Sequence, residues 1–176
     1  RGFGAIGAGG GSNAFGGATG PFRLFNTGMG DQVMWVVVFA LVSLVAGLVL
    51  AVKHRERNAR TGALVMWGGW FVVTYVVFAF ASGIFHNYYV SALAPAVAAL
   101  CGIGVSTARR AGRAGAAVIA ITALATIPLQ RLLLDRVDAY RWLRVLIPVG
   151  LVLAAIAAIA SLYAEAATEL KGLSHG

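Results

Sequence analysis

The stretch from Val33 to Val52, VMWVVVFALVSLVAGLVLAV, decides the fold. It contains twenty residues and no charged side chain. At about 1.5 Å of rise per residue, a helix of this length crosses the roughly 30 Å hydrocarbon core of a bilayer. The sequence therefore predicts a membrane-spanning helix here, with Trp35 near one interface.

The composition of the whole chain agrees with a lipid environment. Hydrophobic residues make up 60% of the 176 residues and charged residues only 11%, whereas soluble domains contain about 25% charged residues. A globule of this size has too little interior to bury so much apolar surface. The apolar runs are continuous rather than alternating, which favours helices over a barrel. We therefore expect an all-α integral membrane bundle.

Five apolar runs predict about five transmembrane helices. The fourth run is the weakest because its seventeen residues are near the lower limit for crossing. The bundle is expected over 33–163, with spans at 33–52, 62–85, 90–108, 114–130 and 145–163. A Gly-rich external segment and an approach to the membrane are expected at 1–32, where Phe22, Leu24 and Phe25 would lie at the interface.

Basic residues between the spans predict the orientation. The clusters at 53–60 and 109–113 fall on one side and contain seven Lys and Arg residues, whereas the 86–89 turn on the other side contains none. We therefore expect a multi-pass protein of the cell membrane, with the N-terminal segment outside and the 164–176 tail in the cytoplasm. The 131–144 segment departs from the rule, because it carries four Arg on the outer side. Either it lies in the interface as a short helix, which we favour, or the fourth span does not cross.

The remaining composition excludes several functions. The net charge of +8 does not indicate nucleic-acid binding, because the basic residues form short clusters between apolar runs. Membrane lipids are the expected partners of such clusters. Cys101 lies within an apolar run and is interpreted as a small buried residue. The chain starts at Arg1 without a signal peptide, so we expect a piece of a longer protein or a processed one.

The most informative polar cluster is His86-Asn87-Tyr88-Tyr89, at the predicted outer interface. A histidine can donate, accept or carry charge near neutral pH. Two tyrosines add hydroxyl groups on amphipathic rings. Together these side chains are suited to hold a lipid-linked phosphate at headgroup depth. The alternative is an aromatic belt with an incidental histidine.

A second polar group lies in 131–144. Asp135 and Asp138 are three residues apart, and paired carboxylates can bind a metal or transfer protons. Arg131 and Arg141 stand at helical spacing from them, which favours ion pairs instead. The arginines of this segment are also candidate contacts for a lipid phosphate: Arg131, Arg136, Arg141 and Arg144. The sequence contains no recognisable metal-binding cluster and no Ser-His-Asp arrangement, so no metal site or cofactor is predicted.

Several stretches resemble one family of enzymes. Residues 85–96, FHNYYVSALAPA, resemble the Phe-His-Pro-Tyr-Tyr-Thr-x-Ala-Leu-Ala-Pro-Ala stretch of bacterial ArnT-like glycosyltransferases, the YkcA/YkcB-related group. Residues 64–70, LVMWGGW, resemble the Leu-Leu-Leu-Trp-Gly-Gly-Trp of that group, and 23–32 with the Gly-rich stretch before it match in the same order. The resemblance covers about 1–108 and fades across 109–176. Asn87 replaces the usual Pro, and Val90 replaces the usual Thr.

This resemblance implies a GT-C type enzyme, which moves a sugar from a polyprenyl-phosphate carrier to an acceptor on the outer face of the membrane. It implies that His86, Tyr88 and Tyr89 contact the substrate. The catalytic Asp of the family belongs to an external loop that we expect outside these residues, and Asp31 lies in the wrong place to replace it. The chain would then be the C-terminal membrane portion of the enzyme, without a catalytic residue.

Two alternatives have less support. One is a non-catalytic scaffold or accessory subunit of a larger membrane complex, which would bind other membrane proteins. The other is a small transporter, which is disfavoured because no predicted span contains a charged residue in its apolar core.

Overall fold

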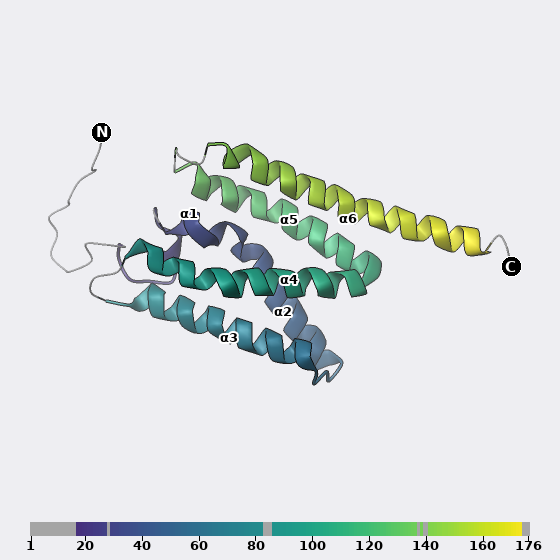
Figure 1. Cartoon of the computed structure of the whole chain (residues 1–176), viewed down its shortest axis with the longest axis horizontal. Coiled ribbons are helices and arrows are strands. Elements are labelled where there is room, and N and C mark those ends of the chain that lie inside the picture. The colour runs from purple at the N-terminus through teal and green to yellow at the C-terminus, as the bar shows by residue number, and fades with distance from the viewer. Residues whose placement is uncertain (1–16, 28, 83–85, 137, 139–140, 174–176) are drawn as a thin grey trace.

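The computed structural model describes residues 17–27, 29–82, 86–136, 138 and 141–173. The regular elements of this part of the chain are all helices (Figure 1). In chain order they are η1 Arg23–Phe25, α1 Gly30–Val33, η2 Met34–Val36, α2 Val37–Lys53, α3 Ala59–Phe80, η3 Asn87–Leu93, α4 Ala94–Arg110, α5 Gly112–Leu134 and α6 Leu143–Leu173. The first sixteen residues of the predicted Gly-rich segment lie outside the described residues.

Five helical segments are long and apolar enough to cross a membrane. They cover Met34–Lys53, Ala59–Phe80, Asn87–Arg110, Gly112–Leu134 and Leu143–Ala160. The prediction of an all-helical chain with five potential membrane spans is therefore confirmed. The orientation of the spans stays a prediction.

Several helix ends differ from the predicted ends. Helix α3 ends at Phe80, five residues before the predicted end of the second span at 85, because Ala81 turns the backbone away from helical geometry with a ψ of 130°. Helix α5 continues through Pro128 to Leu134, so the fourth span has 23 residues instead of seventeen. The segment expected to lie in the interface, 131–144, accordingly begins inside α5 and ends inside α6.

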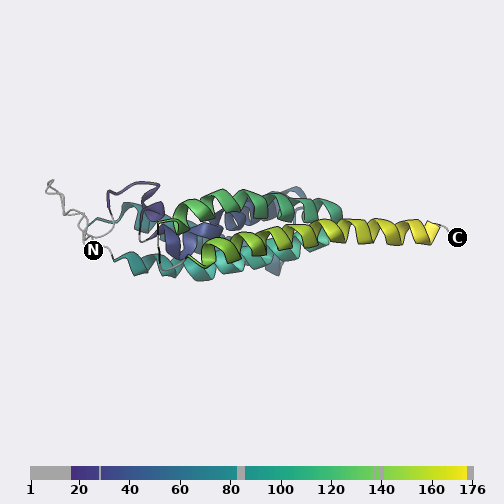
Figure 2. The ribbon, with the colours of Figure 1, turned by 90° about the horizontal axis from the view of Figure 1, so that it is seen from above.

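The helices run roughly side by side, with α4 between α3 and α5 and with α2 crossing α4 (Figure 1). Helix α6 packs antiparallel to α5, and its C-terminal part extends beyond the other helices (Figure 2). The chain reverses between α4 and α5 through Ala111 alone. Gly112 makes this possible because its φ of 54° lies in the left-handed region that other residues disfavour.

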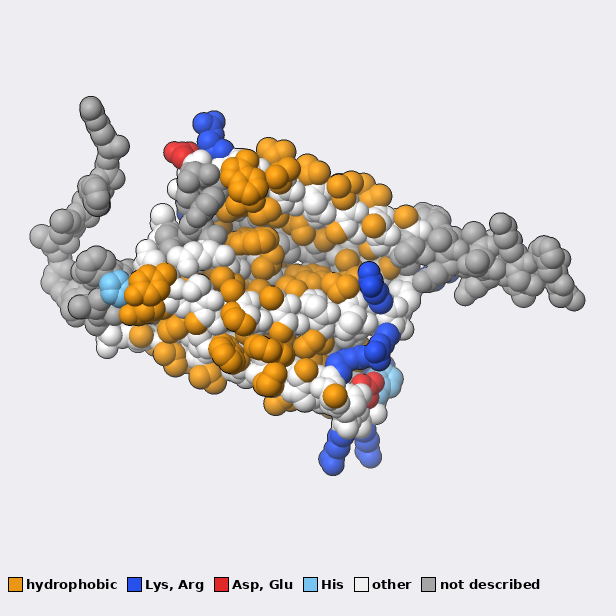
Figure 3. Space-filling model, in the orientation of Figure 1, with side chains coloured by type: hydrophobic (Ala, Val, Ile, Leu, Met, Phe, Trp, Pro, Cys, Tyr) orange, Lys and Arg blue, Asp and Glu red, His pale blue; other side chains and the backbone are white. Residues whose placement is uncertain are grey.

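Hydrophobic side chains cover the middle of the face shown in Figure 3, while Lys and Arg gather at its two ends. The exposed apolar residues include Val45 and Val73. In α6, only 6% of the apolar window is buried inside the structure. Large apolar patches of this kind are rare on soluble monomers and suit contact with lipid or with further helices.

The main hydrophobic core extends from the end of the bundle that holds η1 and η3 to Leu64 near the start of α3. It consists of large side chains from η1 through α4, and from α5 it includes Leu133. Among its fully buried members are Leu24, Met29, Met34, Val90, Leu93 and Leu100. The core therefore fixes the position of the polar turn between α3 and α4.

Candidate functional site

The turn that contains His86, Tyr88 and Tyr89 continues into the short helix η3. The His86 carbonyl accepts a hydrogen bond from the Tyr89 N–H at 3.0 Å, and the Ser91 hydroxyl donates to the Tyr88 carbonyl at 2.6 Å. Pro95 stands in the first turn of α4, where a missing N–H costs no intrahelical hydrogen bond. Local bonds and a proline therefore shape this connection.

The three predicted residues form one aromatic cluster. The ring centroids of His86 and Tyr88 are 5.3 Å apart and the rings are nearly parallel, at 19°. Tyr89 meets both rings edge-on, at 5.5 Å from His86 and 4.8 Å from Tyr88. All three side chains are exposed. The structure thus brings these side chains together on an accessible surface, while their role in substrate binding stays a prediction.

Helix α3 packs against this cluster and against the η3 segment that carries it. The Phe78 ring stacks on Tyr89 with a centroid distance of 6.4 Å. The Trp70 indole N–H donates to the Ala92 carbonyl at 3.1 Å, and Val90 is fully buried in the core. Trp70 belongs to the LVMWGGW stretch and Ala92 to the FHNYYVSALAPA stretch. Two of the stretches that resemble the glycosyltransferases are therefore joined by a hydrogen bond.

The third such stretch, 23–32 with the Gly-rich residues before it, provides hydrogen-bond donors to the C-terminal end of α3. The Arg23 guanidinium is buried and donates to the Phe78 carbonyl at 3.2 Å and to the Ala81 carbonyl at 2.5 Å. The Gly20 N–H donates to the Ala79 carbonyl at 2.9 Å. The last carbonyls of a helix lack partners within the helix, so these donors satisfy groups that would otherwise be buried without a bond.

The apolar residues around Arg23 have different surroundings, while their predicted interfacial location stays a prediction. Phe22 is 75% exposed, whereas Leu24 is fully buried in the core. Phe25 is partly buried and packs against the same core. Leu24 enters the core because η1 turns its side chain inward while Arg23 binds the end of α3.

The four candidate arginines have different surroundings. Arg144 donates to the Leu134 and Asp135 carbonyls at 3.1 Å, and lies 3.5 Å from the carboxylates of Asp135 and of Asp138. Arg136 donates to the Phe25 carbonyl at 2.7 Å. The predicted helical ion pairs of Arg131 and Arg141 are not found among the described residues, because α5 ends at Leu134 and the chain turns toward α6.

These observations separate the arginines into two kinds. Arg144 has a structural role, since it caps α5 and joins both aspartates of the turn. Arg131, Arg136 and Arg141 are exposed and remain candidate contacts for a lipid phosphate. The 135–144 turn and the 86–89 turn lie at the same end of the bundle (Figure 1). Within the described part of the chain, no group of three His, Cys, Asp or Glu side chains could hold a metal ion.

The sequence did not indicate the residues that position the cluster. Arg23 and Trp70 enter the sequence analysis only as members of the 23–32 and 64–70 stretches. Their hydrogen bonds join positions 55, 58 and 22 residues apart. A local pattern cannot reveal such pairs, although a single Arg between apolar residues is a signal that its charge needs several acceptors.

Two known proteins are similar to part of the chain. One, from Bacillus subtilis (strain 168), is named "Putative mannosyltransferase YycA" and is 37% identical over 100 residues, which is 56% of this chain. Another from the same organism, "Putative mannosyltransferase YkcB", is 38% identical over 96 residues, or 53% of this chain. The resemblance to YkcB-related glycosyltransferases is confirmed. The matched segment spans only 14% of the first relative and 13% of the second. No family model and no solved structure matches the chain.

Proposed function

We propose that this chain is the membrane portion of a glycosyltransferase that moves a sugar from a polyprenyl-phosphate carrier to an acceptor outside the cell. The similarity to two proteins named as mannosyltransferases carries this proposal. It is supported by the arrangement of the three stretches on which the resemblance rests, since Trp70 of one stretch binds Ala92 of another and Arg23 of the third binds the end of the same helix, α3.

In this proposal the exposed aromatic cluster binds the donor. The His86 imidazole and the Tyr88 and Tyr89 hydroxyls supply hydrogen-bond donors at the end of an apolar bundle. A polyprenyl-phosphate sugar would keep its chain in lipid and present its phosphate at this depth. Hydrogen bonds to a charged oxygen are stronger than those between uncharged groups. These residues bind and orient the donor, and the catalytic carboxylate belongs to another part of the enzyme.

The test is sugar transfer from a polyprenyl-phosphate donor by membranes that contain the complete gene product. The combined variant His86→Ala with Tyr88→Phe is expected to raise KM for the donor at least about tenfold, from the loss of two hydrogen bonds. Phe22→Leu is the matched control, because Phe22 is an exposed aromatic residue at the same end of the bundle that takes no part in the cluster.

Two negative results have different meanings. If transfer is normal in the double variant, the cluster is not the donor site, although the protein is still a transferase. If the complete, well-folded wild-type protein transfers no sugar from any polyprenyl-phosphate donor, the proposed function is wrong.

A second candidate function is that of a non-catalytic subunit in a larger membrane complex. The observation that favours it is the surface of α6, which is apolar and contacts mainly α5. Such a face suits a further protein helix as well as lipid. Purification in mild detergent distinguishes the two, since a subunit is recovered with other membrane proteins in fixed stoichiometry.

A further inference from the structure

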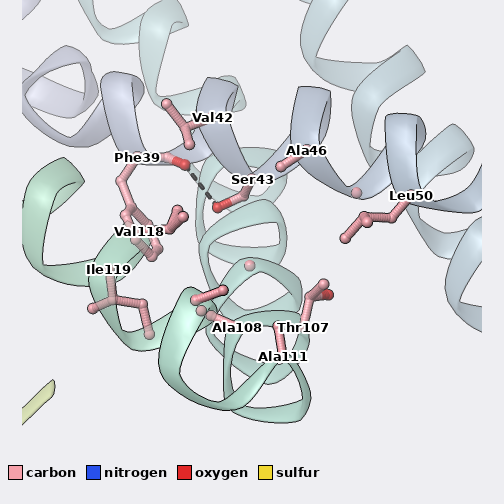
Figure 4. A pocket seen from close by; sticks show the side chains of 14 residues that line it. Phe39, Val42, Ser43, Ala46, Leu50, Thr107, Ala108, Ala111, Val118 and Ile119 are labelled. Carbon is pink, nitrogen blue, oxygen red and sulfur yellow. Dashed lines mark hydrogen bonds between the residues drawn. The ribbon is translucent and has the colours of Figure 1, made fainter. Parts of the chain in front are cut away.

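The opposite end of the bundle contains an apolar groove between α2, α4 and α5 (Figure 4). Its volume is about 220 Å³, and its walls include Phe39, Ala46, Ala114 and Val118. Leu50 and Val118 at its rim are substantially exposed, at 36% and 45%. The groove therefore opens on the outside of the bundle, where hydrocarbon surrounds a protein that spans a membrane.

The walls of this groove present no free polar group to an occupant. Its two hydroxyl-bearing residues are Ser43 and Thr107. The Ser43 hydroxyl donates to the Phe39 carbonyl at 2.7 Å, and the Thr107 hydroxyl donates to the Ile103 carbonyl at 2.8 Å. Because both donors are bonded to their own helices, the groove favours a hydrocarbon chain over a polar ligand.

The groove continues into a second cavity of about 210 Å³ that is basic. The two share lining residues, among them Leu50 and Ala111. The second cavity is lined by Arg60, Arg110 and His54, with Glu56 as its single acidic residue. The Glu56 carboxylate accepts a hydrogen bond from the Asn58 amide at 3.1 Å. Among the described residues, neither arginine is held by a salt bridge, so the pair attracts an anion.

We propose that the joined cavities bind one anionic phospholipid, with an acyl chain in the apolar groove and the phosphate at Arg60 and Arg110. Charge complementarity supports this occupant, because the cations lie where the groove reaches the end of the bundle. A neutral lipid would leave them without a counter-charge.

The direct test is native mass spectrometry of the purified chain in detergent, titrated with dioleoyl phosphatidylglycerol or dioleoyl phosphatidylcholine. We expect one phosphatidylglycerol to bind at least about fivefold more tightly than phosphatidylcholine. Arg60→Gln with Arg110→Gln should weaken it about thirtyfold, since each basic residue near an anionic surface contributes about 1 kcal/mol. Lys53→Gln with Arg113→Gln removes the same charge outside the cavity and should leave binding within about twofold of wild type.

A second pair of variants tests the apolar groove. Ala114→Phe fills it, whereas Ala125→Phe places the same ring on an exposed position of the same helix outside it. Only the first should lower phosphatidylglycerol binding. Equal binding of both lipids, or equal losses in the paired variants, overturns the proposal. So does tighter binding of a polyprenyl phosphate than of phosphatidylglycerol, which would assign the groove to that carrier.

A photo-crosslinking amino acid at position 114 identifies the occupant without relying on the stability of the variants. In intact membranes the expected product carries the mass of a single phospholipid. A crosslink to a second copy of the chain or to another protein would show that a helix fills the groove, and would overturn the proposal.

Discussion

The part of the chain from η1 to α4 and the α5–α6 hairpin are packed in different ways. The first part is joined by large buried side chains and by side-chain donors such as Arg23 and Trp70, which bind distant carbonyls. The hairpin is packed through small residues, and its buried positions include Ala116, Ala120, Ala123 and Ala155. Small residues let helix backbones approach closely in a membrane.

This difference in packing bears on how strongly each region restricts its own sequence. Large side chains that fill one another's spaces, and donors that need a particular carbonyl, restrict the residue type at each position. Packing through alanine and glycine restricts it much less, because many sequences supply small residues at helical spacing. The resemblance predicted over 1–108 would fall on η1 to α4, the region whose packing restricts the residue types more strongly.

In the part from η1 to α4, the largest loss of stability is expected from a substitution of Arg23. Arg23→Gln removes the donor that binds the Phe78 and Ala81 carbonyls, and the residue is only 2% exposed. We expect the free energy of unfolding to fall by about 3 kcal/mol, the value of a buried bond to a charged donor, measured by unfolding in mixed micelles. Arg131→Gln is the control, because that side chain is exposed. Equal losses in the two variants would contradict the structural role of Arg23.

Gly104→Ala, which adds a methyl group, should cause the next largest decrease in the free energy of unfolding. Its Cβ would overlap the Ser43 side chain, so α2 and α4 would have to move apart. Overpacking of this kind costs about 2 kcal/mol. Gly102→Ala is a close control, since its Cβ would meet nothing within 4 Å. Similar unfolding curves for the two variants would show that the α2–α4 contact tolerates separation.

In the hairpin, one substitution should increase stability. The Gln130 side chain is fully buried, and neither its amide nitrogen nor its oxygen has a hydrogen-bond partner among the described residues. Gln130→Met keeps the approximate volume and removes the desolvation cost, so the free energy of unfolding should rise by about 1 kcal/mol. Thr126→Val, one turn earlier, should not stabilise, because that hydroxyl is bonded to the Thr122 carbonyl. A loss of stability in the Gln130 variant would reveal a ligand or water bound to the amide.

The smallest change in the free energy of unfolding is expected from a substitution of Arg144, which caps α5 and pairs with two aspartates. The side chains are partly or largely exposed, at 25% for Arg144 and 96% for Asp138. Arg144→Gln should therefore lower the free energy of unfolding by only about 1 kcal/mol or less, and the difference should shrink in high salt. Arg141→Gln provides the control. A salt-independent loss would mean that the carbonyl bonds to Leu134 and Asp135 dominate.

The sequence was informative where a single physical property determines the outcome. Long uncharged runs predicted the five potential spans, because length and hydropathy decide whether a helix suits a bilayer. The sequence also predicted that His86, Tyr88 and Tyr89 come together, since they are neighbours in one turn. It did not predict the inward side chain of Leu24 or the partners of Arg144. These depend on where helices end and on what lies across from them, which requires the packed structure.

The position of η1 also has a consequence for the order of assembly. Arg23 binds carbonyls that follow it by 55 and 58 residues, and Arg136 binds the Phe25 carbonyl across 111 residues. At about 5–20 residues per second, synthesis of the most distant partner follows that of η1 by roughly 5–20 seconds. Until Phe78 and Ala81 have been made, the Arg23 guanidinium must remain in water, because burial of the charge without these acceptors is too costly. Segment η1 is therefore fixed in place only after helices that follow it in the chain have been made.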